Sequence, residues 1–71
     1  MSLPVVSGQT VVAALGRAGF SRVGQKGSHV KLKNASGRVV IVPMHREVAP
    51  GTLRSILRQA GLTVEEFEKL L

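Results

Sequence analysis

The fold is decided by residues 28–43, which read SHVKLKNASGRVVIVP. From Ser28 to Lys33 polar and apolar side chains alternate, as they do in a half-buried strand. Residues 39–43 consist of four β-branched side chains followed by Pro43, a run long enough for a second, buried strand. The intervening Asn34–Gly37 ends in a glycine, which suits a hairpin loop. The stretch therefore predicts an antiparallel β-hairpin.

Apolar residues at helical spacing lie on both sides of this hairpin. Upstream, Ser7 is a suitable N-cap for a helix that runs to Ala18, and a weaker strand is predicted over Arg22–Gln25. Downstream, an apolar stripe predicts a second long helix over Pro50–Ala60. Thr63–Glu66 has the sequence of a capping box and predicts a short last helix. The residues of that helix expected to be buried are Val64, Phe67, Leu70 and Leu71.

The resulting element order is α-β-β-β-α, followed by the short C-terminal helix, which belongs to the α+β class. In this class the helices gather on one face of an antiparallel sheet. We therefore expect a three-stranded antiparallel sheet with both main helices on one face and the other face open to water or a ligand. A chain of 71 residues is short enough to form a single domain, 1–71.

Composition argues against several classes of protein. The chain has no cysteine, and its two histidines are accompanied by no aspartate, so we expect no metal site and no cofactor. Apolar runs such as Val39–Val42 are far shorter than the roughly 20 residues of a membrane span. Met1–Thr10 carries no positive charge and lacks the pattern of a signal peptide. We expect a cytoplasmic protein that does not bind membranes.

The charge distribution favours a polyanionic partner. The net charge is +6, and residues 1–46 hold seven basic residues and no acid. Each Lys or Arg that contacts a phosphate releases counterions, so such a chain suits nucleic acid. A general contribution to solubility is the competing explanation. An anionic membrane surface is less favoured, because the basic residues do not form one amphipathic helix.

Strand alternation places three of the polar side chains together. His29, Lys31 and Lys33 point away from Val30 and Leu32, and this apolar pair must face the helices. An imidazole beside two ammonium groups suits chemistry on a phosphodiester, because it can exchange a proton with a 2′-hydroxyl or a leaving oxygen while the lysines stabilise charge at phosphorus. On composition alone, a surface histidine in a basic sheet is the simpler interpretation.

Neighbouring residues extend this candidate site. Lys26, Gly27 and Ser28 form the turn into the strand and are candidate phosphate contacts, although ordinary hairpin chemistry also explains them. His45 is a candidate second acid or base, or a contact to a partner. Arg54 continues the positive surface on the second long helix, as an RNA or partner contact or as solvated charge.

Four segments carry a resemblance to a known family, QKGSH at 25–29, GR at 37–38, VPMH at 42–45 and PGTLRSILRQAGL at 50–62. In this order they resemble the HicA mRNA interferase toxins of bacteria and archaea, over Val11–Phe67. The chain departs from that pattern at Val30 and over Ser2–Gly8. The resemblance implies a double-stranded-RNA-binding-domain-like fold, the same α-β-β-β-α order reached above. It also implies RNA cleavage by His29 without an obligatory metal, and inhibition by a HicB antitoxin.

The favoured hypothesis is thus the toxin of a toxin–antitoxin system, an endoribonuclease of the stress response. RNA would lie across the open face, with His29 as general base or acid and Lys26, Lys31 and Lys33 on phosphates. Water, His45 or a lysine would supply the second proton transfer. The alternatives are a non-catalytic RNA-binding module of the same fold and a pure protein-interaction domain. The uncharged start of the second long helix argues against duplex binding, which uses a lysine cluster there.

Overall fold

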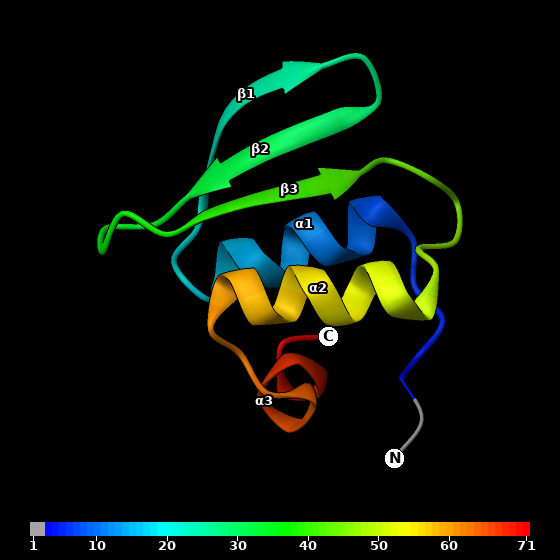
Figure 1. Cartoon of the computed structure of the whole chain (residues 1–71). Helices are drawn as coiled ribbons and strands as arrows, with labels where there is room; N and C mark the ends of the chain where they lie inside the picture. The colour runs from blue at the N-terminus through cyan, green and yellow to red at the C-terminus, as the bar shows by residue number, and fades with distance from the viewer. Residues whose placement is uncertain (1–2) are drawn as a thin grey trace.

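The structure is a computed structural model that describes residues 3–71; Met1 and Ser2, the start of the predicted domain, lie outside the described residues. The elements are α1 (Gly8–Arg17), β1 (Ser21–Lys26), β2 (His29–Lys33), β3 (Val39–Pro43), α2 (Pro50–Ala60) and α3 (Val64–Lys69). The strands form one antiparallel sheet in the order β1-β2-β3. Both long helices lie under one face of it, with α3 beyond them (Figure 1). This confirms the predicted α+β, double-stranded-RNA-binding-domain-like fold.

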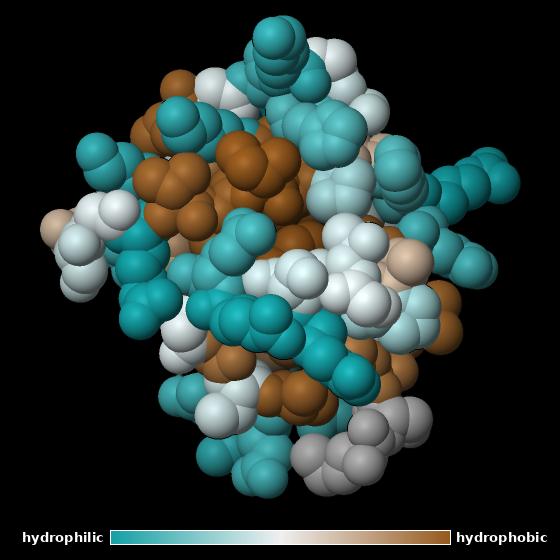
Figure 2. All heavy atoms as spheres, viewed as in Figure 1, coloured by the Kyte–Doolittle hydropathy of each residue, from teal (hydrophilic) through white to brown (hydrophobic). Residues whose placement is uncertain are grey.

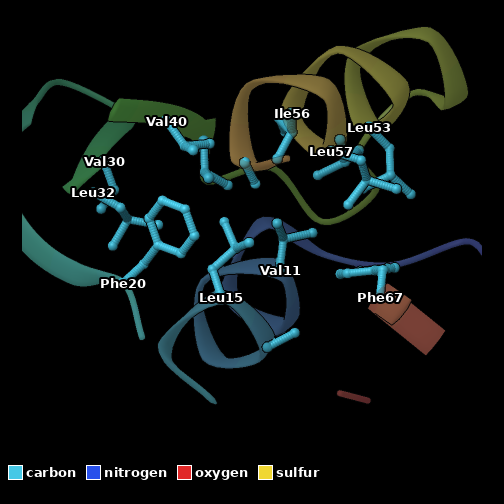
Figure 3. Packing of buried hydrophobic residues seen from close by; sticks show 14 residues of the cluster. Val11, Leu15, Phe20, Val30, Leu32, Val40, Leu53, Ile56, Leu57 and Phe67 are labelled. Carbon is cyan, nitrogen blue, oxygen red and sulfur yellow. The ribbon is translucent and has the colours of Figure 1, made fainter. Parts of the chain in front are cut away.

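The register of β2 against β3 builds the sheet side of the core. Val30 pairs with Val42 and Leu32 pairs with Val40, and all four side chains are buried. Figure 3 shows Phe20 beside Leu32, with the side chains of α1 and α2 completing the cluster. Val30 is therefore a core residue.

Local capping bonds set the helix ends, beginning with the predicted N-cap Ser7. The Ser7 hydroxyl accepts from the Thr10 N–H at 3.0 Å, which starts α1. At its other end the Phe20 N–H donates to the Leu15 carbonyl at 3.0 Å, and the Leu62 N–H donates to the Leu57 carbonyl at 2.9 Å after α2. These are the bonds of Schellman endings.

The capping box of α3 is also formed. The Thr63 N–H donates to the Glu66 carboxylate at 2.8 Å, and the Glu66 N–H donates to the Thr63 hydroxyl at 3.0 Å. Hydrogen bonding to the Thr63 backbone, and then to the Thr63 side chain, lowers the pKa of Glu66 below its ordinary value of 4.5. The folded chain therefore favours the ionised carboxylate. Its stabilisation of α3 is present at pH values above 4.5 and is lost as the pH falls through the lowered pKa of Glu66.

Some boundaries and burial predictions differ from the structure. β1 is one residue longer at each end than Arg22–Gln25, and β2 begins at His29 because Ser28 belongs to the turn. Phe67 is buried, whereas Val64 and Leu70 are only half-buried. Leu71 was expected in the core and is 50% exposed, because α3 ends at Lys69 and the chain passes beyond the core. Within residues 3–71 no helix combines the length and apolarity needed to cross a bilayer.

The start of α1 is packed directly against the connection between β3 and α2. The Gly8 N–H donates to the His45 carbonyl at 2.9 Å, and the Val48 N–H donates to the Val6 carbonyl at 2.8 Å. A Cβ at Gly8 would lie 2.8 Å from the Met44 Cα and would overlap the Pro43 carbonyl oxygen. Only glycine permits this approach of two backbones.

We predict that Gly8→Ala lowers the free energy of unfolding by about 1–3 kcal/mol, because the added methyl forces backbone apart as in other overpacked sites. Gly16→Ala is the matched control, since it lies in the same helix and a Cβ there meets nothing within 4 Å. We expect the control to raise stability by up to about 1 kcal/mol through helix propensity. Urea unfolding of the two variants measures both, and equal midpoints would contradict the close packing at Gly8.

Candidate functional site

The open face of the sheet carries the predicted site. His29, Lys31 and Lys33 are all exposed on β2, the central strand. Their cross-strand partners are Lys26, Gly24 and Ser21 on β1 and Pro43, Ile41 and Val39 on β3. Since paired residues of an antiparallel sheet point to the same face, these residues form three parallel rows. The structure therefore places together His29, Lys31, Lys33 and Lys26.

His29 occupies one end of the central row. It is the first residue of β2 and pairs with Lys26 across the hairpin and with Pro43 on β3. Directly opposite residues in such a sheet have Cβ atoms about 4.5–5.5 Å apart. The imidazole thus has one cationic side chain beside it on β1 and another, Lys31, two residues further along its own strand.

Hydrogen bonds on both flanks hold the turn before His29. The turn has two residues, and Gly27 takes a φ of +59°, which a side chain would resist, while Ser28 keeps a negative φ. The Gln25 side-chain amide donates to the Gly27 carbonyl at 3.1 Å. On the other flank the Met44 N–H donates to the Ser28 carbonyl at 2.6 Å. The backbone leading into the candidate catalytic residue is therefore fixed from β1 and from β3.

Positive charge on this face is not balanced by acids within the sheet. The four glutamates lie in the connection before α2 and in α3, at Glu47, Glu65, Glu66 and Glu68. The strands contribute Lys26, Lys31 and Lys33 to this face, whereas Arg22 pairs with the buried Leu32 and so belongs to the other face. The sheet is thus a purely cationic element, as the distribution of charge along the sequence indicated.

His45 lies at the same end of the sheet as the turn. It follows Met44, which is hydrogen-bonded to Ser28, and its own carbonyl accepts from Gly8 at 2.9 Å. Its side chain is exposed. The structure therefore brings His45 near the turn at Gly27 and Ser28, although no hydrogen bond within residues 3–71 joins the two histidine side chains.

Arg54 is not part of this group. It is exposed on α2, and α2 packs against the face of the sheet opposite to the one that carries His29. A ligand confined to the open face would not reach it.

Two residues of the open face were missed by the sequence reasoning. Val39 and Ile41 are each 40% exposed beside the lysine row, although β3 was expected to be a buried strand. Every residue of β3 is apolar, so hydrophobicity alone does not indicate which side chains of the strand face the core. Pairing with the alternating strand β2 was the available signal, because it assigns Val39 and Ile41 to the face of Lys33 and Lys31. Figure 2 shows apolar atoms reaching the surface at the level of the sheet, framed by hydrophilic side chains.

Residues 3–71 contain no cluster of three or more His, Cys, Asp or Glu side chains able to hold a metal ion.

Comparison with known proteins identifies the family. The chain matches the family model described as the HicA toxin of bacterial toxin–antitoxin systems, over residues 8–62. No curated protein sequence matches it. The family match begins three residues before the predicted Val11 and ends five before Phe67, and it includes the whole sheet, the turn and α2. As this is more than half of the chain, the protein belongs to the HicA toxin family.

Proposed function

We propose that this toxin is a metal-independent endoribonuclease, an mRNA interferase, that binds RNA on the open face of its sheet. The observation that supports it is the exposed row of His29, Lys31 and Lys33 on the central strand, with Lys26 paired to His29. The row suits a polyanion because the strands contain no acid. The cytoplasm is the compartment in which such a toxin meets mRNA.

In the proposed reaction, His29 acts as the general base. Its neutral imidazole takes the proton of a 2′-hydroxyl, whose oxygen attacks the adjacent phosphorus in line. The bond to the 5′-oxygen breaks, which leaves a 2′,3′-cyclic phosphate and a 5′-hydroxyl. The leaving oxygen needs a proton, and His45, a lysine or water supplies it; His29 and its partner exchange roles if His29 is instead the acid.

The remaining candidates bind the substrate. Lys26, Lys31 and Lys33 stabilise phosphate charge during attack, and the Ser28 hydroxyl and the backbone at Gly27 offer further donors at the turn. Arg54 remains a proposed phosphate contact for an RNA that extends past the edge of the sheet.

The competing function is a non-catalytic RNA-binding module. It would use the same cationic face, because phosphate contacts alone give binding without cleavage. Exposure of His29 is a requirement of the catalytic function, since a buried imidazole could not reach a 2′-hydroxyl. Incubation of the purified chain with end-labelled RNA separates the two functions.

We also propose that a HicB-type antitoxin inhibits the toxin by covering the open face. An interface of standard size buries about 1,200–2,000 Å² in total, about half of it on each partner. The toxin exposes only 4471 Å², so such an interface would occupy much of the face around His29.

For catalysis, we expect His29→Ala to reduce cleavage by about 10²–10⁴-fold, the usual contribution of general acid–base catalysis. The unfolding midpoint should stay at the parent value, because the side chain is exposed. His45→Ala in parallel tests the second proton transfer. Cleavage should continue in EDTA. A loss below tenfold for His29→Ala would point to another base, and a requirement for added Mg²⁺ would overturn the metal-free mechanism.

For binding, Lys31→Ala and Lys33→Ala should each weaken RNA affinity and reduce the slope of log affinity against log salt by about 0.7 for a single strand. Lys69→Ala on α3 is the control, because it removes the same charge away from the sheet. Fluorescence anisotropy over a range of salt concentrations gives the slopes. If Lys31→Ala and Lys33→Ala both behave like the parent and like the control, RNA does not lie on the open face.

For inhibition, we expect binding of the antitoxin and binding of RNA to be mutually exclusive. HicB-type antitoxin is titrated into a complex of the His29→Ala toxin with labelled RNA, and the RNA should be released as the antitoxin saturates. A stable ternary complex at saturation would show that inhibition acts elsewhere.

A further inference from the structure

The outer edge of β3 ends the sheet without a neighbouring strand. β3 pairs with β2 alone, and hydrogen bonds just beyond its two ends show which residues face β2. At the start the Asn34 N–H donates to the Arg38 carbonyl at 3.1 Å, and at the end the Met44 N–H donates to the Ser28 carbonyl at 2.6 Å. Arg38 and Met44 therefore both turn their backbone groups toward β2.

Alternation along the strand fixes the residues between these two. Since Arg38 and Met44 face inward, Val40 and Val42 also face β2, and the N–H and C=O groups of Val39 and Ile41 point away from it. No backbone hydrogen bond joins Val39 or Ile41 to a loop, cap or further strand within residues 3–71. The sheet thus presents a row of unpaired donors and acceptors on this side.

The opposite edge of the sheet has features that discourage pairing. β1 has an irregular register between Arg22 and Gly24, and it carries the charged side chains of Arg22 and Lys26. Bulges and charges of this kind prevent edge strands from pairing with other chains. β3 has neither, and only its Pro43 end is closed, by the lack of an N–H and by Gly8 packed against its carbonyl. The open part of the edge is Val39–Ile41.

The side chains beside this edge define what a fourth strand would meet. Val39 and Ile41 are each 40% exposed on the open face, and they pair with Lys33 and Lys31. An added strand would set alternate side chains against this apolar pair, with the two ammonium groups one strand further in.

The positive charge of the chain indicates which kind of strand could pair with the β3 edge. A second copy of the chain would bring another +6. Antiparallel pairing of two β3 strands would also set Arg38 of one copy near the end that leads to His45 and Arg46 of the other, so like charges would meet at both ends. A segment with acidic side chains meets the lysines favourably instead.

We propose that the Val39–Ile41 edge of β3 binds an extended, acidic segment of a partner protein, which joins the sheet as a fourth strand. The hydrogen bonds of the added strand would come from Val39 and Ile41, and its acids would face Lys31 and Lys33. This inference does not depend on RNA cleavage, and the experiments that test it measure peptide binding alone.

The probe is a capped peptide of about six residues, the usual strand length, with alternating Glu and Val. Its counterpart with Lys in place of Glu tests the charge requirement. We expect the acidic peptide to slow hydrogen exchange at the amides of Val39 and Ile41, measured by NMR, and the basic peptide to leave both unchanged. Equal protection by both peptides, or by a single-stranded RNA instead, would overturn the proposal. So would protection of these amides in a concentrated sample without peptide, which would indicate self-pairing.

The variant Ile41→Pro removes one outward N–H and leaves the bonds to β2 in place. We expect it to weaken binding of the acidic peptide by about 3- to 10-fold, the effect of one hydrogen bond. Gln25→Pro is the matched control, because Gln25 faces outward on the β1 edge, and it should leave the affinity unchanged. Val39→Pro provides a second test if Ile41→Pro does not fold, since proline is tolerated at the first residue of a strand. Parent affinity in the folded variants would contradict an added strand at β3.

Discussion

The pairing of β2 with β3 is the constraint on which the rest of the structure depends. Val30 with Val42, and Leu32 with Val40, form the buried surface that receives both helices. Because side chains alternate, burying this set exposes His29, Lys31 and Lys33 together. A slip of one residue would place lysines against the core and valines in water. The same contacts that stabilise the fold therefore also assemble the candidate site.

The end of the sheet near His29 is tied to distant parts of the chain. The connection after β3 bonds to Ser28 through Met44, to the start of α1 through His45 and Gly8, and to the N-terminal segment through Val48. A shift of the connection would be transmitted through Met44 to the turn at Gly27 and Ser28. The backbone around His29 is thus supported by contacts that lie outside the sheet, among them the bond from Gly8 to the His45 carbonyl.

The sequence allowed prediction of what local chemistry determines. Ser7, Thr63 and the Gly-Phe and Gly-Leu endings set the helix limits through bonds to residues close in sequence, so Pro50–Ala60 was predicted with its observed bounds. Alternation in β2 likewise predicted the row of His29 and the lysines. The irregular pairing of β1 and the backbone contact at Gly8 depend on which residue lies opposite which, and no local pattern carries that information. The exposure of Ile41 follows only once β3 is paired with the alternating strand β2. The role of each site residue is still a prediction.

The short distance between the β3 edge and the lysine row means that a partner bound at the edge would affect RNA binding on the open face. Ile41 lies beside Lys31, so a strand added at the β3 edge would lie two strand spacings, roughly 10 Å, from the lysine row. That separation is about one Debye length at 0.1 M salt, so acids on such a strand would still reduce the positive potential that attracts phosphate. A partner at the edge would then weaken RNA binding even without covering His29. Inhibition of this kind would fade as salt is added, whereas steric covering of the open face would not, because it excludes RNA by volume rather than by charge.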